Sequence, residues 1–561
     1  MPSARAGTSV RILTVSPSSS GPGERCSPTT GSCPGGYGEG AGQTFAAMRA
    51  TTVKAGSPTQ VTWSDKLGRP VKRSVRGFNG SFVQTLTEYD RMGTVAREST
   101  PHFAGGTAHW TTFDQYDQLG RVQQKTAPGS EMDPVNGNVL TKYAYSGTRT
   151  DIRVQGTAFS STAPCPANRP CMAMARWHDA LGRLVRTEDA LGGTVKYWYD
   201  GAGNPVAAQD AEGHVTRASY NDLGHRTHRM DPNAGSASFT YDGFGQVLTQ
   251  TDARNVTTTH TYDALGRLIQ RTSTNPAGAG LPAESVRDTW EYDPPGANGG
   301  AGLLGVQRRQ RGLGLPVVWQ ESYAWESTTK RLSSQTTTME GESPWTTGYA
   351  YDPTYGREDT VTYPSGLSVR TGYTADGYAN SLSNASTGFT WWTATSQDAW
   401  GATSGETFGN GIVGTHTSYA STGQSQQKRW TNNAVLFDQF QYAYDSFGNL
   451  TSQQRAMNLG TPQTVQETYA YDRLQRLTQS TRIGVPGSPA PVSLGYSASG
   501  NLSYKSDNGQ ATPGSYAYGG NGCGPHAVTS VARNAPTPAR TYGCDAAGNV
   551  SSRTTPVSQR Q

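Results

Sequence analysis

Short stretches of alternating apolar and polar residues are separated by turn-forming residues along most of the chain. Residues 237–241 (ASFTY) and 256–262 (VTTTHTY) alternate in character and are rich in Thr, Tyr, Phe and Val, which is typical of strands with two unlike faces. Residues 263–266 (DALG) have turn chemistry, since Asp bonds its own backbone and Gly accepts a left-handed conformation. Residues 267–272 (RLIQRT) alternate again, so the pattern predicts a β-hairpin.

The sequence pattern of this hairpin recurs at a fixed spacing along the chain. Five copies follow one another every 21 residues, and a Gly lies four positions after the first residue of each copy. Looser copies extend from about residue 60 to Cys544. The repeat positions are His178, Tyr199, Tyr220, Tyr241 and Tyr262 in the strict series, Tyr89, Tyr116, Tyr444 and Tyr471 in looser copies, and Gly120, Gly182, Gly203, Gly224, Gly245, Gly266 and Gly448 in the turns. No window shows a capped helical stripe. We therefore predict an all-β fold in which repeated hairpins pair in series in one long antiparallel sheet.

The repeated side chains have structural roles in this interpretation. We expect each Tyr to pack its ring against the neighbouring hairpin and to place its hydroxyl at a wet edge. The Arg that follows the Gly, as in Arg121, Arg183 and Arg267, lies where it can stack on such a ring or pair with a nearby Asp. A residue that recurs in every unit usually marks a recurring packing solution.

Composition supports a sheet without a thick apolar core. Hydrophobic residues make up 34% of the 561 residues, and 68 are Gly. Such a chain can form a long sheet that twists and curls, around a partly polar interior. The net charge of +5 is spread without basic clusters, which argues against a nucleic-acid partner. No run of 18 apolar residues exists, so no membrane span is predicted.

The chain divides by composition into three segments. Residues 1–50 are rich in Ser, Gly and Pro and are expected to be disordered, and their apolar run at 10–15 is shorter than that of a signal peptide. Residues 51–555 form the repeat region, with long loops expected near 125–175 and 272–345, and residues 556–561 form a tail. We draw no domain boundary at the loops, although long loops in repeat arrays can form binding surfaces.

The six cysteines fall into local pairs without C-x-x-C spacing: Cys26 with Cys33, Cys165 with Cys171, and Cys523 with Cys544. Local disulfides and free thiols are both compatible with this pattern.

The sequence shows no catalytic or cofactor motif. It lacks a G-x-S-x-G elbow, an H-E-x-x-H helix, a Walker loop and a Rossmann fingerprint. His225 and His228 offer two imidazoles to a metal, but no third ligand is evident, and we interpret them as exposed polar residues. An Asp in every hairpin turn is better explained by turn chemistry than by glycoside hydrolysis, which needs one pair of carboxylates at one substrate. We expect neither enzymatic activity nor a cofactor.

The repeat resembles the Rhs/YD-repeat family. The motifs YDQLGRV at 116–122, YDALGRL at 262–268 and YDSFGNL at 444–450 have its signature, and DAWGATSGETFGNGIV at 398–413 and GPHAVTSV at 524–531 are typical of its later repeats. The resemblance covers roughly residues 60–551. It implies a sheet wound into a hollow shell, which in bacterial toxins encloses a C-terminal toxic domain and in teneurins serves adhesion at the cell surface.

The resemblance also sets expectations about what this chain lacks. The family's core has an Asp-Pro-x-Gly motif where self-cleavage frees the cargo, and Asp231-Pro232 and Asp293-Pro294 do not match it. We therefore expect a non-catalytic, truncated scaffold of a toxin shell, secreted or at the cell surface, whose partners are a toxin domain or another shell segment. The alternative is an extracellular adhesion or carbohydrate-binding protein that uses the loops near 272–320 and the pair Trp391-Trp392.

Overall fold

The computed structural model describes residues 9–13, 46–129, 138–156, 171–275, 284–293, 302–312, 314, 316–458, 460–487, 489–508, 512–533 and 538–554. Within these residues every regular element is a strand, so the all-β prediction is confirmed, and no helix is present that could cross a membrane. Thirty-nine strands form one sheet, and the last four, β40–β43, form another.

The strands of the first half are β1 (Ser9–Leu13), β2 (Met48–Val53), β3 (Gln60–Ser64), β4 (Pro70–Arg76), β5 (Phe82–Tyr89), β6 (Val95–Ser99), β7 (His102–Phe103), β8 (Trp110–Tyr116), β9 (Val122–Pro128), β10 (Asn138–Ser146), β11 (Arg149–Gly156), β12 (Cys171–His178), β13 (Leu184–Glu188), β14 (Thr194–Tyr199), β15 (Pro205–Gln209), β16 (Val215–Tyr220), β17 (Arg226–Asp231), β18 (Gly235–Tyr241), β19 (Val247–Thr251), β20 (Thr257–Tyr262), β21 (Leu268–Asn275), β22 (Glu284–Tyr292), β23 (Leu304–Arg311), β24 (Val317–Trp325) and β25 (Leu332–Met339).

The remaining strands are β26 (Trp345–Tyr351), β27 (Glu358–Thr362), β28 (Ser368–Tyr373), β29 (Ala379–Asn384), β30 (Thr390–Gln397), β31 (Thr403–Phe408), β32 (Ile412–Ser418), β33 (Ser425–Asn432), β34 (Val435–Tyr444), β35 (Leu450–Asn458), β36 (Pro462–Tyr471), β37 (Leu477–Ile483), β38 (Val492–Tyr496), β39 (Leu502–Lys505), β40 (Tyr516–Gly520), β41 (Cys523–Val531), β42 (Arg540–Cys544) and β43 (Val550–Thr554).

Nearly every strand pairs antiparallel with the strand that precedes it and the strand that follows it. In the strict repeat, β18 pairs with β19, β19 with β20, and β20 with β21. The short β7 is an exception, because it pairs with β5 beside β6, and β6 then pairs with β8. This serial pairing is the arrangement that identical hairpins in sequence predict.

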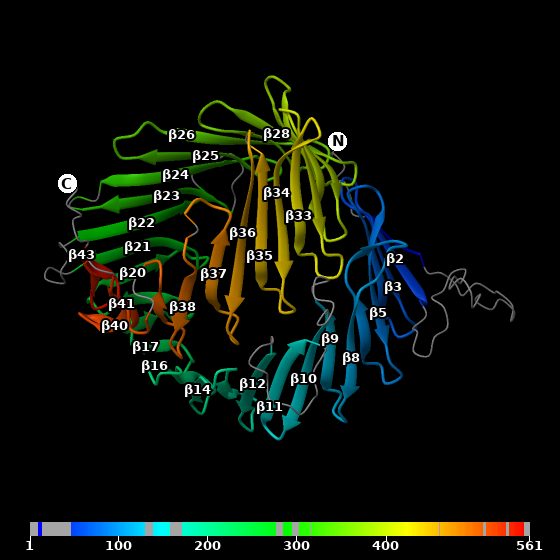
Figure 1. Ribbon diagram of the computed structural model, residues 1–561. Helices are drawn as coiled ribbons and strands as arrows, with labels where there is room; N and C mark the ends of the chain where they lie inside the picture. Colours follow the sequence, from blue (N-terminus) through cyan, green and yellow to red (C-terminus); the bar gives the residue numbers. More distant parts are fainter. Residues whose placement is uncertain are drawn as a thin grey trace.

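The long sheet curls around on itself without closing into a barrel. In Figure 1 the chain passes from β2–β5 through β8–β12 and β14–β26, and β33–β38 then return across the gap between the first strands and the green strands. Contacts described below place the later strands against the earlier ones. We call β1–β25 the first winding and β26–β43 the second winding. The prediction of a wound, partial shell is confirmed at this level.

Two stretches expected to be long loops contain strands. β10 and β11 lie within residues 125–175, and β21–β26 cover most of 272–345, so the loop expectation is wrong for these parts. Strands of up to nine residues in these stretches, such as β10, β22 and β24, break the 21-residue spacing while they keep the hairpin pattern. The parts at 130–137, 157–170, 276–283 and 294–301 lie outside the described residues.

The ends of the chain are described only in part. β1 pairs with β2, so the expectation of disorder for residues 1–50 is wrong for residues 9–13 and for 48–50, which are strand. The rest of the first 45 residues and the tail at 556–561 lie outside the described residues. The division into three segments otherwise stays a prediction.

The core is thin in the part of the chain that the structure describes. The apolar side chains that the structure buries are few, and many are small: Val61, Val71, Ile152, Cys171, Ala175, Ala237, Ala394, Tyr419, Val465, Cys523 and Val531. The burial pattern of β20 alternates between half-buried and exposed residues over His260–Tyr262. Hydrogen bonds between strands and within turns must therefore provide much of the stability that a thick core provides in a globular domain.

The turn after β20 shows how each hairpin is closed. The Asp263 carboxylate oxygen Oδ1 accepts hydrogen bonds from the backbone amides of Leu265 and Arg267, both at 2.9 Å. The Gly266 amide donates to the Asp263 carbonyl at 3.0 Å, and Gly266 has a φ of 78°. The pairing register shifts between Thr261 and Tyr262, as in a hairpin that ends in a β-bulge.

The left-handed position belongs to the turn and not to the glycine. In the copy that follows Tyr471, Gln475 replaces the Gly and still has a φ of 64°. A non-Gly residue in this region is strained, typically by about 1–3 kcal/mol.

Replacing Gly266 with Val should therefore destabilise the protein by about 1–3 kcal/mol, because a β-branched residue tolerates a positive φ poorly. Ala264→Val is the matched control, since Ala264 lies exposed in the same turn and is not among the residues with positive φ. Thermal or chemical denaturation measures both variants. Equal losses of stability would show that the strain of the left-handed position does not govern this turn.

Candidate functional site

The repeat tyrosines connect neighbouring hairpins. In the strict series each hydroxyl donates to the carbonyl oxygen at the start of a strand in the preceding hairpin, from Tyr199 to Leu184, Tyr220 to Pro205, Tyr241 to Arg226 and Tyr262 to Val247, at 2.7–3.0 Å. The same bond recurs in looser copies, from Tyr89 to Pro70, Tyr116 to Val95 and Tyr471 to Leu450. Burial raises the pKa of Tyr262, which therefore stays a hydroxyl donor well above neutral pH.

The arginine after the turn glycine makes both of the contacts considered for it. Arg183 Nε donates to Asp179 Oδ2 at 2.6 Å, and its guanidinium carbon lies 4.8 Å from the centroid of the Tyr199 ring. Arg267 bonds Asp263 at 2.6 Å and lies 4.4 Å from the Tyr292 ring centroid. Hydrogen bonds from the Arg267 amide and side chain and from the Leu265 amide hold the pKa of Asp263 below its usual value. The turns that contain Arg183 and Arg267 are thus linked to the tyrosines of the next hairpins.

The other repeat positions share a recurring local geometry. All seven turn glycines have positive φ: Gly120 at 73°, Gly182 at 79°, Gly203 at 93°, Gly224 at 77°, Gly245 at 85°, Gly266 at 78° and Gly448 at 87°. His178 ends β12 before the turn at Asp179, and the register shifts beside it as it does beside the tyrosines. Tyr444 packs edge-on against Tyr419, with ring centroids 6.2 Å apart.

A second series of Asp turns lies on the other edge of the sheet, and we did not predict it. Asp189, Asp210, Asp231 and Asp252 lie roughly midway between the repeat residues and cap turns with the same backbone bonds. Their spacing of 21 residues was available in the sequence as a signal. We call the edge with the turns after the repeat tyrosines the tyrosine edge, and the other the opposite edge.

The tyrosine edge of the second winding contacts the opposite edge of the first winding. The hydroxyl of Tyr378 donates to the Arg76 carbonyl, and Ser421 Oγ donates to the Gly129 carbonyl. Arg254 forms an ion pair with Asp545 at 3.4 Å. These partners are 302, 292 and 291 residues apart in the chain, so one winding takes about the same length of chain at each contact.

The backbones also approach closely along this contact between the windings, which we call the seam. A Cβ on Gly377 would lie 2.1 Å from the Gly56 carbonyl oxygen, and one on Gly548 would lie 2.2 Å from the Asn233 carbonyl oxygen. Each of these pairs joins a turn of the second winding to a turn of the first. The windings are therefore in direct backbone contact at these points.

The tyrosine edge of the first winding is apolar and exposed. In seven of its described turns the third residue is a large apolar side chain that is 73–94% exposed: Leu67, Met92, Leu119, Leu181, Leu223, Phe244 and Leu265. In the second winding the corresponding Trp400 is 38% exposed, since its ring covers Gly423 and its indole donates to the Ala420 carbonyl. A row of exposed apolar side chains of this size marks an interaction surface.

The remaining candidates from the sequence do not form a site together. His225 and His228 are half-buried and not exposed: His225 packs against the Tyr241 ring at 4.9 Å between centroids, and His228 Nε2 lies 3.1 Å from Ser236 Oγ. Trp391 and Trp392 are also half-buried, and the Trp392 indole donates to Glu406 at 2.7 Å.

The described cysteines are oxidised. Cys523 is bonded to Cys544 across β41 and β42, and Cys171 is also disulfide-bonded. Cys26, Cys33 and Cys165 lie outside the described residues.

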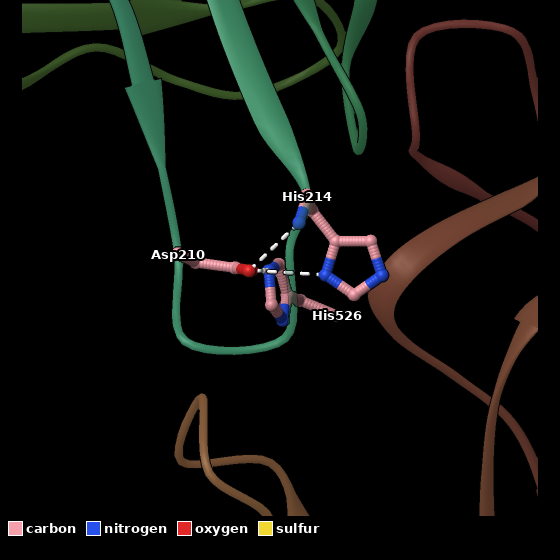
Figure 2. A group of neighbouring side chains, drawn as sticks. All are labelled: Asp210, His214 and His526. Carbon is pink, nitrogen blue, oxygen red and sulfur yellow. Dashed lines mark hydrogen bonds and ion pairs between the residues drawn. The ribbon is translucent and has the colours of Figure 1, made fainter. Parts of the chain in front are cut away.

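In the part of the chain that the structure describes, one group of three His, Cys, Asp or Glu side chains has a metal-binding arrangement. It comprises Asp210 and His214 on the opposite edge of the first winding and His526 on β41 (Figure 2). Its signal in the sequence was weak, because 312 residues separate the two histidines.

Comparisons with known proteins agree with this architecture. The family model of the RHS Repeat matches residues 178–216, 220–257 and 241–279. No curated protein matches the sequence. Among solved structures, the Photorhabdus luminescens Tc holotoxin pore with a point mutation in TccC3 superposes with a TM-score of 0.62 at 15% identity, over 91% of this chain and 30% of that chain.

Two crystal structures give similar values. TcdB2–TccC3–TEV matches with a TM-score of 0.60 at 16% identity, over 90% of this chain and 31% of its own. TcdB2–TccC3 without its hypervariable C-terminal region matches with a TM-score of 0.58 at 16% identity, over 92% of this chain and 31% of its own. This chain thus spans less than a third of the matched chains, and at these identities the likeness shows the fold. The chain therefore contains RHS repeats within residues 178–279, and its sheet of hairpins has the fold of the matched structures.

Proposed function

We propose that this chain is a non-catalytic wall segment of a toxin shell, whose sheet encloses a toxin domain until delivery. The stacking of the second winding on the first supports this function most directly, because a wall that encloses a cargo needs windings that seal edge to edge. The contacts at Tyr378, Ser421 and Asp545 make that seal at similar chain separations. The matched structures are toxin complexes, and this also favours a function as a wall segment of a toxin shell.

A further shell segment is the second partner that we propose. The exposed tyrosine edge of the first winding has the same turns that, in the second winding, rest on an opposite edge. Its apolar row of Leu223, Phe244 and Leu265 is therefore suited to another wall segment that presents an opposite edge. We place the assembled protein outside the producing cell or at its surface, where an enclosed toxin acts.

The repeated acidic residues favour a scaffold over an enzyme. In the described turns the Asp carboxylates are used by backbone amides and by Arg, as at Asp179 and Asp263. Catalysis needs a nucleophile, a base and an oxyanion site that converge at one place. A group that repeats in every hairpin and is already bonded does not provide this.

Enclosure can be tested by co-expression with the toxin-coding region that we expect downstream of this gene. The toxin should co-purify with the shell, and added protease should digest it at least tenfold more slowly than the toxin alone. The measurement is the half-life of the toxin band in a protease time course, with an unrelated domain mixed with the shell as control. A toxin digested equally fast with and without the chain would contradict the proposal.

The apolar edge predicts self-association of the isolated chain. Replacing Leu223, Phe244 and Leu265 together with Ser should reduce association in sedimentation velocity and reduce binding of an apolar dye. Stability should change little, by about 0.5 kcal/mol per exposed site at most. Trp400→Ser is the contrasting variant, since Trp400 packs on Gly423 and its loss should lower the melting temperature. Unchanged association in the triple variant would refute a role for this edge.

The purified chain should not cleave itself. Incubated for a day at neutral pH, it should run as one band of 59.8 kDa. The control is the same sample with protease inhibitors, which removes cleavage by contaminants. A discrete shorter fragment that forms at a rate independent of protein concentration and in the presence of inhibitors would overturn the scaffold reading.

A further inference from the structure

One contact between the windings has the chemistry of a metal site. Asp210 and His214 flank the turn between β15 and β16, and His526 approaches them from β41 in the four-stranded sheet (Figure 2). Ligand atoms of the three side chains all lie within 4.8 Å of one another. Each side chain is 24–33% exposed, so an ion can reach the group from solvent.

Both histidines approach the same carboxylate oxygen. His214 Nδ1 lies 2.9 Å and His526 Nε2 lies 2.8 Å from Asp210 Oδ2, and the two rings are nearly perpendicular at 81°. The other oxygen, Asp210 Oδ1, accepts the backbone amides of Glu212 and His214. The turn therefore fixes the carboxylate and points Oδ2 at the imidazoles.

The surroundings of His526 determine which of its nitrogens faces the carboxylate as an acceptor. The side-chain amide of Asn501 donates through Nδ2 to the Pro525 carbonyl at 3.1 Å, which leaves its oxygen facing His526 Nδ1 at 3.2 Å. Nδ1 must then bear the hydrogen, and Nε2 of a neutral ring presents its lone pair. When the ring is neutral, His526 Nε2 and Asp210 Oδ2 are both acceptors at 2.8 Å, and a cation bound to both atoms would stabilise this arrangement.

This orientation is the one that metal-binding histidines show. A ligating imidazole usually donates its other N–H to a carbonyl or carboxylate, which fixes the ring. His526 has such a partner in Asn501, and its backbone amide is held by Asn233 Oδ1 at 2.9 Å. Glu212, the nearby acidic residue, instead accepts the Ser499 amide and is not in the ligand group.

We propose that Asp210, His214 and His526 bind a divalent transition metal, best matched by Zn²⁺, with water at the fourth position. Two imidazoles and a carboxylate are a common zinc ligand set, at about 2.0–2.2 Å from the ion. Tetrahedral ligands at that distance lie about 3.4 Å apart, so each histidine nitrogen needs to move about 0.5–0.6 Å away from Asp210 Oδ2, whose present distances are 2.9 and 2.8 Å.

The metal would fasten the four-stranded sheet to the first winding. β40–β43 form a sheet of their own, so side-chain and turn contacts attach them to the first winding. A shared ion would join residues 210 and 526 directly. This consequence rests on the proposed shell function, whereas the metal site itself does not.

The test is zinc binding by the full-length chain after removal of metal with a chelator. Calorimetry should give one tight site per chain, and added zinc should raise the melting temperature. His526→Ala and His214→Ala should each weaken this site at least tenfold and abolish the thermal shift. His228→Ala is the matched control, because His228 lies on a neighbouring strand outside the group, and it should bind zinc as the parent does.

Cobalt gives a second readout that does not depend on stability. One equivalent of Co²⁺ should produce the visible absorption of a four-coordinate site in the parent and in His228→Ala, but not in His526→Ala. Far-ultraviolet spectra and size-exclusion profiles check that each variant keeps its sheet. Absence of zinc binding at micromolar concentration, or equal binding in the parent and His526→Ala, would overturn the proposal and leave only the direct contacts of the two histidines with Asp210. Either outcome is independent of whether the shell protects a toxin.

Discussion

The aspartate carboxylate that closes many of the hairpin turns is the interaction on which the rest of this structure depends. One oxygen holds two backbone amides and shapes the turn, as Asp263 does for Leu265 and Arg267. The other oxygen holds the arginine, whose guanidinium then lies on the tyrosine of the next hairpin. The tyrosine hydroxyl bonds back to the preceding strand. Each turn therefore orders its own hairpin and its neighbour, which a single-layer sheet with few buried side chains requires.

The same turns later become the surfaces through which the sheet meets itself. A twisted sheet of many strands curls as its twist accumulates. Here the curl brings turns near residues 378, 421 and 545 onto turns near 76, 129 and 254. The polar turn groups that face solvent elsewhere pair across this seam, and the glycines allow the backbones to meet. The first winding's tyrosine edge keeps the same turns with their apolar side chains exposed, which is why we expect a further wall segment there.

Contact across the seam also brings the residues of the proposed metal site together. His526 belongs to the stretch GPHAVTSV, and it meets Asp210 and His214 only because the second winding returns to the first. Asn501 and Asn233, from two further turns, orient its ring and backbone. The repeats alone would give many equivalent turns. Among the described residues, their winding brings together one group of three side chains, Asp210, His214 and His526, that could hold a metal ion.

Local sequence specifies the hairpin, its turn and the serial order of the strands. These features depend on interactions within about 21 residues of the chain. Residues such as Asp263, Gly266 and Tyr262 specify them locally. The repeat pattern therefore predicted the all-β sheet and the arginine contacts. It failed where longer strands such as β10 and β22 broke the spacing without breaking the hairpin rule.

The length of one winding, the edge that is covered and the side chains that meet across the seam are visible in the three-dimensional structure alone. These follow from small twists summed over many strands, and no local pattern encodes such a sum. Asp210 and His526 were therefore separate polar residues in the sequence, and the curvature of the sheet makes them neighbours.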